Sequence, residues 1–374
     1  MMSFLPGRAV GFLFVAVVCA ACGPGGSGDD GDDITPTVYK YYAYVSNASD
    51  ERIAAYAINT DTGALTAVPG SLLTGHAPVA LKVEPKGKFV YVANRGSDSI
   101  SAYAIAPATG ALTEIAGSPF TAGTYPNSLG IDPSGRFLYA ANLFSHDVSG
   151  FLINASTGAL TGMAGSPFVP LPGIECSYVV ADPAGRSFAY VTHDIRTSAL
   201  TIDPSTGALS ATAGSPFDTG SGPLAIDPQS RFFYVALSLE GRVAAFAIDA
   251  ASGALTAVPG APFAAGTGPS SATVDPAGKF VYVANADSNS VSAFTLQAAT
   301  GALTQVAGSP FTAGTRPLHV AVEPRGRFVY VANYFSHNIS VYAIAPATGA
   351  LTEIAGSPFP QHGAYCLDTV KIAQ

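Results

Sequence analysis

The chain has 374 residues, of which only 11% are charged, and its formal net charge at pH 7 is −8. Lysine and arginine together number 17 and form no basic stripe, so nucleic acid is not expected as a partner. The chain is also too long for a small scaffold held together by disulfides, and it should bury a large core of its own.

Residues 1–21 are predicted to be a lipoprotein signal peptide. Arg8 precedes an apolar run from Val10 to Ala21, which matches a signal-peptide core and is too short to span a bilayer. The run ends in Cys-Ala-Ala-Cys-Gly, and small residues before a cysteine resemble a bacterial lipoprotein processing site. Cys22 is therefore the expected lipidation site, and an ordinary cleaved signal peptide is the alternative.

Residues 22–37 are rich in glycine and aspartate and are predicted to form a flexible tether. Residues 38–374 would then form the folded domain. We expect a protein of the bacterial cell envelope, lipid-anchored and either periplasmic or on the cell surface. It should touch the membrane through the anchor alone, and we expect a monomer.

Almost everything after the tether consists of near-copies of one unit, and 267–314 is a clear example. The tyrosine of its YVAN segment recurs seven times at spacings of 44 to 51 residues, a period typical of propellers, solenoids and arrays. These tyrosines are Tyr44, Tyr91, Tyr139, Tyr190, Tyr234, Tyr282 and Tyr330.

Each copy contains four strand-like segments, which in the example read SSATV, KFVYVAN, SVSAFTL and ALTQVAG. The first two are joined by Asp-Pro-Ala-Gly-Lys, in which proline and glycine favour a tight turn. We therefore predict an all-β fold, a seven-bladed β-propeller of four-stranded antiparallel blades. A solenoid is the alternative, although solenoid repeats are usually shorter or contain helices.

The first copy begins at its second strand, YYAYVSN, and lacks a first strand. The C-terminal segment 365–373 reads YCLDTVKIA and matches the missing piece. The C-terminal strand should therefore close the first blade and remove the open sheet edge that an unclosed fan would expose.

The loop that leads into the first strand of each blade and the loop between its second and third strands should share one face of the ring. All six histidines fall in or next to these loops: His76, His146, His193, His319, His337 and His362. Ligands of propellers tend to bind at one mouth of the central channel, so this face is the expected binding face.

Residues on this face form two groups of candidates. Candidates for acid–base chemistry or anion positioning are Glu175, His193, Arg316 and His319. Candidates for ligand contacts are His76, Arg95, Asp194, Arg196 and Asp368. We expect no metal site and no cofactor, because no two histidines have short ligand spacing and no phosphate-cradling glycine loop leads into a helix.

Two histidines have a structural explanation. His146 and His337 occupy a loop position where other copies carry Asp98 or Asn289, and this position favours residues that tolerate a tight conformation. Two cysteines, Cys176 and Cys366, fall near the starts of innermost strands in different blades. The sequence leaves open whether they form a disulfide or stay as buried thiols.

The YVAN segments at Tyr91, Tyr282 and Tyr330, the YVTH segment at Tyr190 and the Asp-Pro-x-Gly-Arg-Phe turn resemble the YVTN-repeat propellers. They also resemble the seven-bladed lactonase family that includes 6-phosphogluconolactonase-type proteins. The resemblance covers residues 39–373 and implies a propeller that opens a lactone at the channel mouth. It also implies a Pro-Arg-His sequence at the start of one innermost strand, to which Arg316-Pro317-Leu318-His319 is the nearest approach.

Two functional hypotheses follow. The main one is a binding module that holds an unidentified small molecule or protein on its histidine-bearing face, because the segments 105–120 and 344–359 are identical and such uniformity suits a structural repeat. The alternative is a lactonase-like hydrolase that opens a sugar lactone or another lactone.

Overall fold

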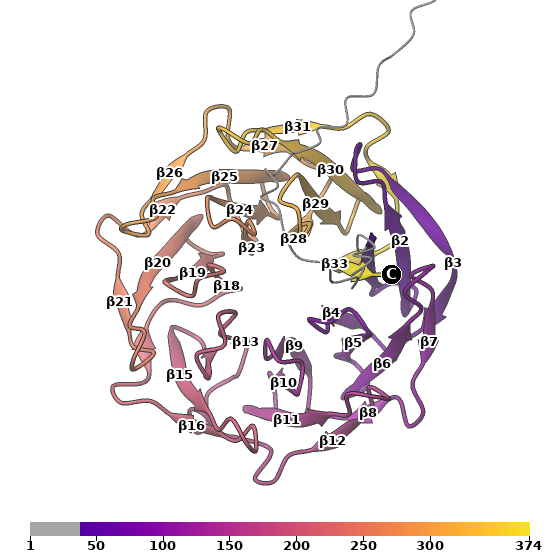
Figure 1. The fold of residues 1–374 in the computed structure, drawn as a ribbon. Helices are drawn as coiled ribbons and strands as arrows, with labels where there is room; N and C mark the ends of the chain where they lie inside the picture. The colour runs from indigo at the N-terminus through magenta and orange to yellow at the C-terminus, as the bar shows by residue number, and fades with distance from the viewer. Residues whose placement is uncertain (1–37) are drawn as a thin grey trace, which may run out of the picture. The chain divides into compact units, whose positions relative to one another are not determined.

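The computed structural model describes residues 38–374, which form a closed ring of seven blades (Figure 1). The all-β propeller prediction is confirmed, and no helix occurs in residues 38–374. None of these residues therefore belongs to a helix that could cross a membrane. The predicted signal peptide, the tether and the lipidation site Cys22 lie outside the described residues.

Each blade is an antiparallel sheet whose strands follow one another outward from the central channel in chain order, except that the C-terminal β33 is innermost in the first blade. The innermost strands are β33 (Ala364–Ala373), β4 (Pro78–Val83), β9 (Pro126–Ile131), β13 (Tyr178–Ala181), β18 (Leu224–Ile226), β23 (Pro269–Val274) and β28 (Pro317–Val322). The second strands are β1 (Tyr39–Asn47), β5 (Phe89–Asn94), β10 (Phe137–Asn142), β14 (Phe188–Thr192), β19 (Phe232–Leu237), β24 (Phe280–Asn285) and β29 (Phe328–Asn333).

The outer half of each blade holds the third and fourth strands. The third strands are β2 (Arg52–Ile58), β6 (Ser99–Ile105), β11 (Asp147–Ile153), β15 (Arg196–Ile202), β20 (Arg242–Ile248), β25 (Ser290–Leu296) and β30 (Asn338–Ile344). The fourth strands are β3 (Leu65–Leu73), β7 (Leu112–Glu114), β12 (Leu160–Gly162), β16 (Leu209–Ala211), β21 (Leu255–Ala257), β26 (Leu303–Gln305) and β31 (Leu351–Glu353).

Five blades also carry a two-residue strand that pairs with their third strand, which the sequence did not predict. These short strands are β8 (Phe120–Thr121), β17 (Phe217–Asp218), β22 (Phe263–Ala264), β27 (Phe311–Thr312) and β32 (Phe359–Pro360). Each begins at the phenylalanine of the repeated Gly-x-Pro-Phe segment, whose half-buried ring packs against a cluster of buried hydrophobic side chains.

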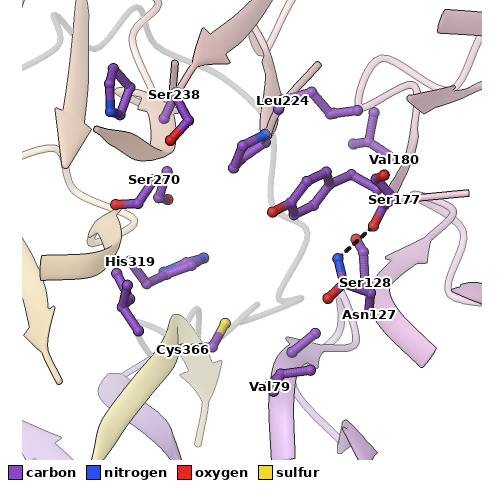
Figure 2. Close-up of a pocket in the computed structure, with 18 of the residues that line it drawn as sticks. Val79, Asn127, Ser128, Ser177, Val180, Leu224, Ser238, Ser270, His319 and Cys366 are labelled. Atoms are coloured by element: carbon purple, nitrogen blue, oxygen red, sulfur yellow. Dashed lines mark hydrogen bonds between the residues drawn. The ribbon is translucent and has the colours of Figure 1, made fainter. Parts of the chain in front are cut away.

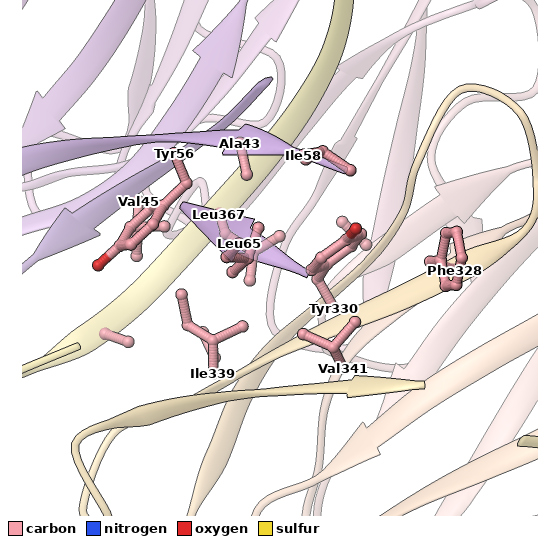
Figure 3. Packing of buried hydrophobic residues seen from close by; sticks show 13 residues of the cluster. Ala43, Val45, Tyr56, Ile58, Leu65, Phe328, Tyr330, Ile339, Val341 and Leu367 are labelled. Atoms are coloured by element: carbon pink, nitrogen blue, oxygen red, sulfur yellow. The ribbon is translucent and has the colours of Figure 1, made fainter. Parts of the chain in front are cut away.

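The C-terminal strand β33 is the innermost strand of the first blade, as predicted. It pairs with β1 along nine residues, from Tyr39 opposite Ala373 to Asn47 opposite Ala364. Its Leu367 packs with side chains of β1, β2 and β3 against side chains of β29 and β30 (Figure 3). The first and last blades therefore share a hydrophobic core that only the end of the chain completes.

A ring of hydrogen bonds joins every blade to the next. The buried tyrosine of each second strand donates its hydroxyl to the carbonyl oxygen of the glycine in the next blade's Gly-Ala-Leu loop. The pairs are Tyr44–Gly110, Tyr91–Gly158, Tyr139–Gly207, Tyr190–Gly253, Tyr234–Gly301, Tyr282–Gly349 and Tyr330–Gly63, at 2.7–3.1 Å. Burial raises the pKa of all seven hydroxyls.

The turn between the first and second strands is held by an acidic side chain. In blade three, Asp132 accepts hydrogen bonds from the backbone N–H groups of Arg136 (2.8 Å) and Phe137 (2.6 Å). Gly135 adopts a φ of 71°, the left-handed region that glycine enters without strain. This explains why the Asp-Pro-x-Gly turn recurs on the face opposite the histidines.

The loops between the second and third strands confirm the structural explanation of two histidines. His146 and His337 have φ values of 58° and 52°. Their equivalents Asp98 and Asn289 both have φ of 51°. The position requires a left-handed backbone conformation, and Asn, Asp and His adopt this conformation more readily than most residues.

The innermost strand of blade five departs from the repeat. Strand β18 has three residues, whereas most innermost strands have six. The segment before it passes close to β19, and a Cβ atom at Gly222 would collide with the carbonyl oxygen of Ala236. The channel wall is therefore built differently at blade five.

Candidate functional site

The central channel contains a cavity of about 740 Å³. Its walls are the innermost strands, and its mouth is formed by the loops between second and third strands of several blades. Figure 2 shows Ser128, Ser177, Ser238 and Ser270 around this space, with His319 and Cys366 on one side. Cavities of this size hold small molecules of ordinary metabolite size.

The pairing between innermost and second strands shows which wall residues lie at the same height in the channel. The residues opposite the seven repeated tyrosines lie at one height, which we call the lower tier. This lower tier consists of Lys82, Gly130, Val180, Ala225, Thr273, Ala321 and Asp368. Two residues nearer the mouth, the upper tier consists of Ala80, Ser128, Tyr178, Pro223, Ser271, His319 and Cys366. Most of these side chains are small or uncharged, so the few ionisable ones stand out.

Lys82 and Asp368 are the only charged residues of the two tiers, and they occupy the same position in adjacent blades. The two oxygens of Asp368 accept backbone N–H groups of Val83 (3.0 Å) and Thr369 (2.9 Å), which fixes the carboxylate against the first two blades. Within residues 38–374 neither Lys82 nor Asp368 belongs to an ion pair. Both therefore remain able to contact a ligand.

His319 lies in the upper tier, and its ring points into the cavity (Figure 2). Its Nδ1 atom is buried and has no hydrogen-bond partner among the described residues. Desolvation, with a smaller contribution from the positive charge of Lys82, lowers the pKa of His319 to about 3. The imidazole is therefore neutral at physiological pH and can accept or donate a hydrogen bond.

Cys366 follows His319 around the upper tier. Burial raises the pKa of its thiol to about 12, so the group stays protonated and is a poor nucleophile. Cys366 and Cys176 are both free and buried, and they form no disulfide.

The cavity lining also includes aromatic, amide and guanidinium groups. Burial raises the pKa of Tyr178 to about 12, so its phenol is neutral. Asn127 donates to the carbonyl oxygen of Ser177 at 2.8 Å and accepts a hydrogen bond from Arg95. The Arg95 guanidinium also lies over the rings of Tyr125 (4.9 Å) and Tyr365 (5.9 Å).

The structure brings four of the nine candidate residues to the cavity. They are His319, Arg95, Asp194 and Asp368. Three others are exposed on the same face and contact acidic side chains away from the wall: His76 forms a hydrogen bond with Glu51, and Arg196 and Arg316 form ion pairs with Asp218 at 3.0 Å and with Asp287 at 3.5 Å.

Glu175 and His193 also lie away from the cavity wall. His193 is fully buried; its Nδ1 donates to the backbone carbonyl of Glu175 at 2.9 Å, and its Nε2 accepts from the hydroxyl of Ser198 at 2.8 Å. In blade two, Asn94 occupies the same position and donates to Ser101 at 2.9 Å. His193 thus fixes the loop of blade four as Asn94 does in blade two, and desolvation lowers the pKa of its ring.

Lys82, Tyr178 and Glu240 line the cavity but were not among the residues selected from the sequence. Lys82 could have been found by aligning the copies on their tyrosines, since it stands where the other innermost strands carry small or apolar residues or Asp368.

Within residues 38–374, no group of three or more His, Cys, Asp or Glu side chains could hold a metal ion. The cavity lining presents two cations, Lys82 and Arg95, and a neutral imidazole, together with three carboxylates and several hydroxyl groups.

Comparison with known proteins gives one family and a set of similar folds. The family described as lactonase, 7-bladed beta-propeller, matches residues 38–176 and 178–368. No curated protein matches the sequence significantly.

Three solved structures are similar to the ring, each 22% identical and covering 88% of this chain. They are a candidate 6-phosphogluconolactonase of Bacteroides fragilis (TM-score 0.76, 98% of that chain), another from Bacteroides uniformis (0.75, 99%) and a periplasmic gluconolactonase of Pseudomonas aeruginosa (0.75, 99%). At this identity the similarity establishes the fold.

Proposed function

This chain belongs to the seven-bladed β-propeller lactonase family, and from that premise we propose that it hydrolyses a lactone in the central channel. The similar structures include proteins named for 6-phosphogluconolactone and for gluconolactone, which supports lactones as the substrate class. The proposal replaces the binding module as the main hypothesis, because the family assignment favours hydrolysis.

One observation carries the proposal: Lys82, Asp368 and His319 line the same side of the cavity, on the innermost strands of the adjacent blades two, one and seven. Hydrolysis of an ester needs a group that activates water, a group that stabilises the oxyanion and a group that orients the carbonyl. A carboxylate, an ammonium and a neutral imidazole meet these needs.

In this scheme Asp368 accepts a proton from water as the water oxygen attacks the lactone carbonyl carbon. The carbonyl oxygen becomes an oxyanion, and the Lys82 ammonium stabilises it in a partly desolvated channel. Collapse of the tetrahedral intermediate breaks the bond to the ring oxygen, which receives the proton held by Asp368. The product is the open hydroxy acid.

His319 would position the substrate without changing its own charge. Its neutral ring can donate a hydrogen bond from one nitrogen to the lactone and accept one from water at the other. A histidine that titrated near neutral pH would lose this acceptor on protonation, and the low pKa prevents that.

The test measures ring opening of glucono-δ-lactone, δ-valerolactone and γ-butyrolactone by titrating the acid released. The variant Lys82→Met should lower kcat by about a hundredfold, as removal of an oxyanion donor commonly does. The matched control Lys279→Met removes the same charge from an exposed turn and should keep the full rate. Rates at the uncatalysed level for all three lactones, or equal rates in the two variants, would refute the proposal.

We also propose that the protein acts in the cell envelope. The support is the sequence of the first 22 residues, which combines an apolar segment with a lipoprotein-like cysteine. The variant Cys22→Ala should move the protein from the membrane fraction to the soluble fraction after expression with its own leader. Unchanged membrane association would contradict lipidation at this residue.

A further inference from the structure

The loops of blades four and five place two large apolar side chains in water at the cavity mouth. Ile195 is 64% exposed and Leu239 is 103% exposed, and both line the cavity. Below them, Leu224 and Leu237 continue the apolar wall toward the channel, and Figure 2 shows Leu224 at this wall. An apolar surface that leads from solvent into a cavity indicates a place where apolar ligand atoms are buried.

These loops are also the ones that depart from the repeat. The turn of blade four is shortened, with its third strand starting at Arg196, and the innermost strand of blade five has three residues. The segment 220–223 lines the cavity where other blades would have a longer strand. The departures therefore fall on the side of the mouth that carries the exposed Ile195 and Leu239.

The charges on this side exclude an anionic ligand group. The charged residues of blades four and five that line the cavity are Asp194 and Glu240, both exposed carboxylates. Arg196, which follows Ile195, does not line the cavity and pairs with Asp218 at 3.0 Å. The two cationic residues of the cavity, Lys82 and Arg95, both belong to blade two. A phosphate placed against blades four and five would meet two carboxylates and no cation in the cavity lining there, so an uncharged group fits better.

The patch is too small to hold a protein partner by itself. A stable protein interface buries about 800 Å² on each partner, whereas this surface offers two exposed apolar side chains flanked by carboxylates. A flexible apolar arm of a small ligand needs no more than this.

We propose that blades four and five form a subsite for an uncharged apolar chain attached to the lactone ring. The inference rests on the proposed function, and it selects alkyl-substituted lactones over phosphorylated sugar lactones. The lower tier of blade five is Ala225, opposite Tyr234, and Leu237 is the third residue beyond Tyr234 on β19. At the rise of a β-strand Leu237 therefore lies about 10 Å nearer the mouth than the lower tier, a height that only a chain of several methylene groups can span.

The experiment compares δ-lactones that differ only in their substituent: none, methyl and heptyl. The heptyl lactone should have a KM at least tenfold below that of the unsubstituted lactone, with a similar kcat, because the chain binds equally in the ground state and the transition state. A KM that does not change with chain length would overturn the proposal while leaving lactone hydrolysis intact.

The double variant Ile195→Ser, Leu239→Ser removes the exposed apolar groups from positions where folding does not depend on them. It should raise the KM for the heptyl lactone about tenfold and leave the KM for the unsubstituted lactone unchanged. The matched control is Phe335→Ser, at the loop position of blade seven equivalent to Leu239, where the side chain is 58% exposed and does not line the cavity. Equal KM values for the heptyl lactone in the double variant and the wild type would overturn the subsite.

A binding measurement separates this proposal from the proposed activity. The heptyl-substituted δ-lactam keeps the ring and the chain but resists hydrolysis, so calorimetry with the intact protein reports the subsite alone. It should bind at least tenfold more tightly than unsubstituted δ-valerolactam, and the double variant should abolish the difference. If the chain strengthens binding while no lactone is turned over, the subsite holds and the hydrolase assignment fails; if the chain adds nothing, the subsite is refuted.

Discussion

The ring of tyrosines and the wall of the channel are built from neighbouring strands, yet the residue type is the same in every blade for the tyrosines and differs between blades on the wall. All seven second strands present a tyrosine to the next blade, and all seven make the same hydrogen bond. On the innermost strands, the residue opposite that tyrosine varies from glycine to lysine and aspartate. Uniform positions hold the blades together, and variable positions give the cavity its chemistry.

The largest loss of stability should come from removing residues 364–374, because the first blade then has no innermost strand. Leu367, Val370 and Ile372 of β33 are buried, and each contributes about 1.5–3 kcal/mol, so the truncation costs on the order of 5 kcal/mol or more. That is comparable with the whole stability of a typical domain. Calorimetry should show no cooperative unfolding transition, and a truncated protein that melts like the intact one would contradict the closure.

A smaller loss of stability should occur at acid pH, because the buried His319 of the channel wall resists protonation. The pKa of His319 is about 3 in the folded protein and 6.5 as a reference, so between these values the unfolded chain binds the proton and the folded protein does not. Stability is therefore lost as pH falls below 6.5, on the order of 2 kcal/mol by about pH 4.5.

Urea unfolding at about pH 7.5 and 4.5 tests this dependence. His319→Gln should lose less stability than the wild type across this interval, although the lowered pKa of His193 leaves part of the acid sensitivity in place. The exposed His76 provides the control, and His76→Gln should behave as the wild type. An identical loss in His319→Gln and the wild type would show that the histidine is not desolvated in the channel.

Breaking one bond of the tyrosine ring should cost less. Tyr282→Phe removes the hydroxyl that donates to Gly349 at 3.0 Å and leaves a buried carbonyl oxygen without that partner. The expected loss is about 1–2 kcal/mol by urea unfolding, with no change in lactone turnover. Tyr39→Phe, at a 44% exposed tyrosine, is the control and should unfold at the wild-type urea concentration.

The smallest effect is expected at Arg316. Its ion pair with Asp287 is exposed at both ends, and its guanidinium lies 5.4 Å from the centre of the exposed Phe335 ring. Such a pair contributes little, so Arg316→Ala should change stability by under about 0.5 kcal/mol and kcat/KM by less than about twofold. A tenfold loss of kcat/KM would place Arg316 in the reaction.

The sequence was sufficient for the fold because the signals are local and repeated seven times. The tyrosine spacing, the Asp-Pro-x-Gly turn and the match of residues 365–373 to a missing strand each predict an element that the structure contains. The tight loops at His146 and His337 could be predicted for the same reason, since their equivalents are residues that accept a positive φ.

The site was harder to predict from the sequence than the fold, because it depends on strand register and on local insertions and deletions. The pairing of Lys82 with Tyr91 and of Asp368 with Tyr44 is what places these two charged side chains at one level of the channel. His193 stood out as an irregularity, whereas the structure shows it bonding the serine that an asparagine bonds elsewhere. A residue that departs from a repeat can preserve the repeat's contacts.

The most direct test compares two variants in the same two measurements. Lys82→Met and Tyr282→Phe should be assayed for kcat/KM on δ-valerolactone and for urea unfolding, at a concentration where both are fully folded. We predict that Lys82→Met loses about a hundredfold in rate at nearly unchanged stability, and that Tyr282→Phe loses stability at an unchanged rate. The reverse pattern, or equal losses of both properties in the two variants, would contradict the division between the uniform ring and the variable channel wall.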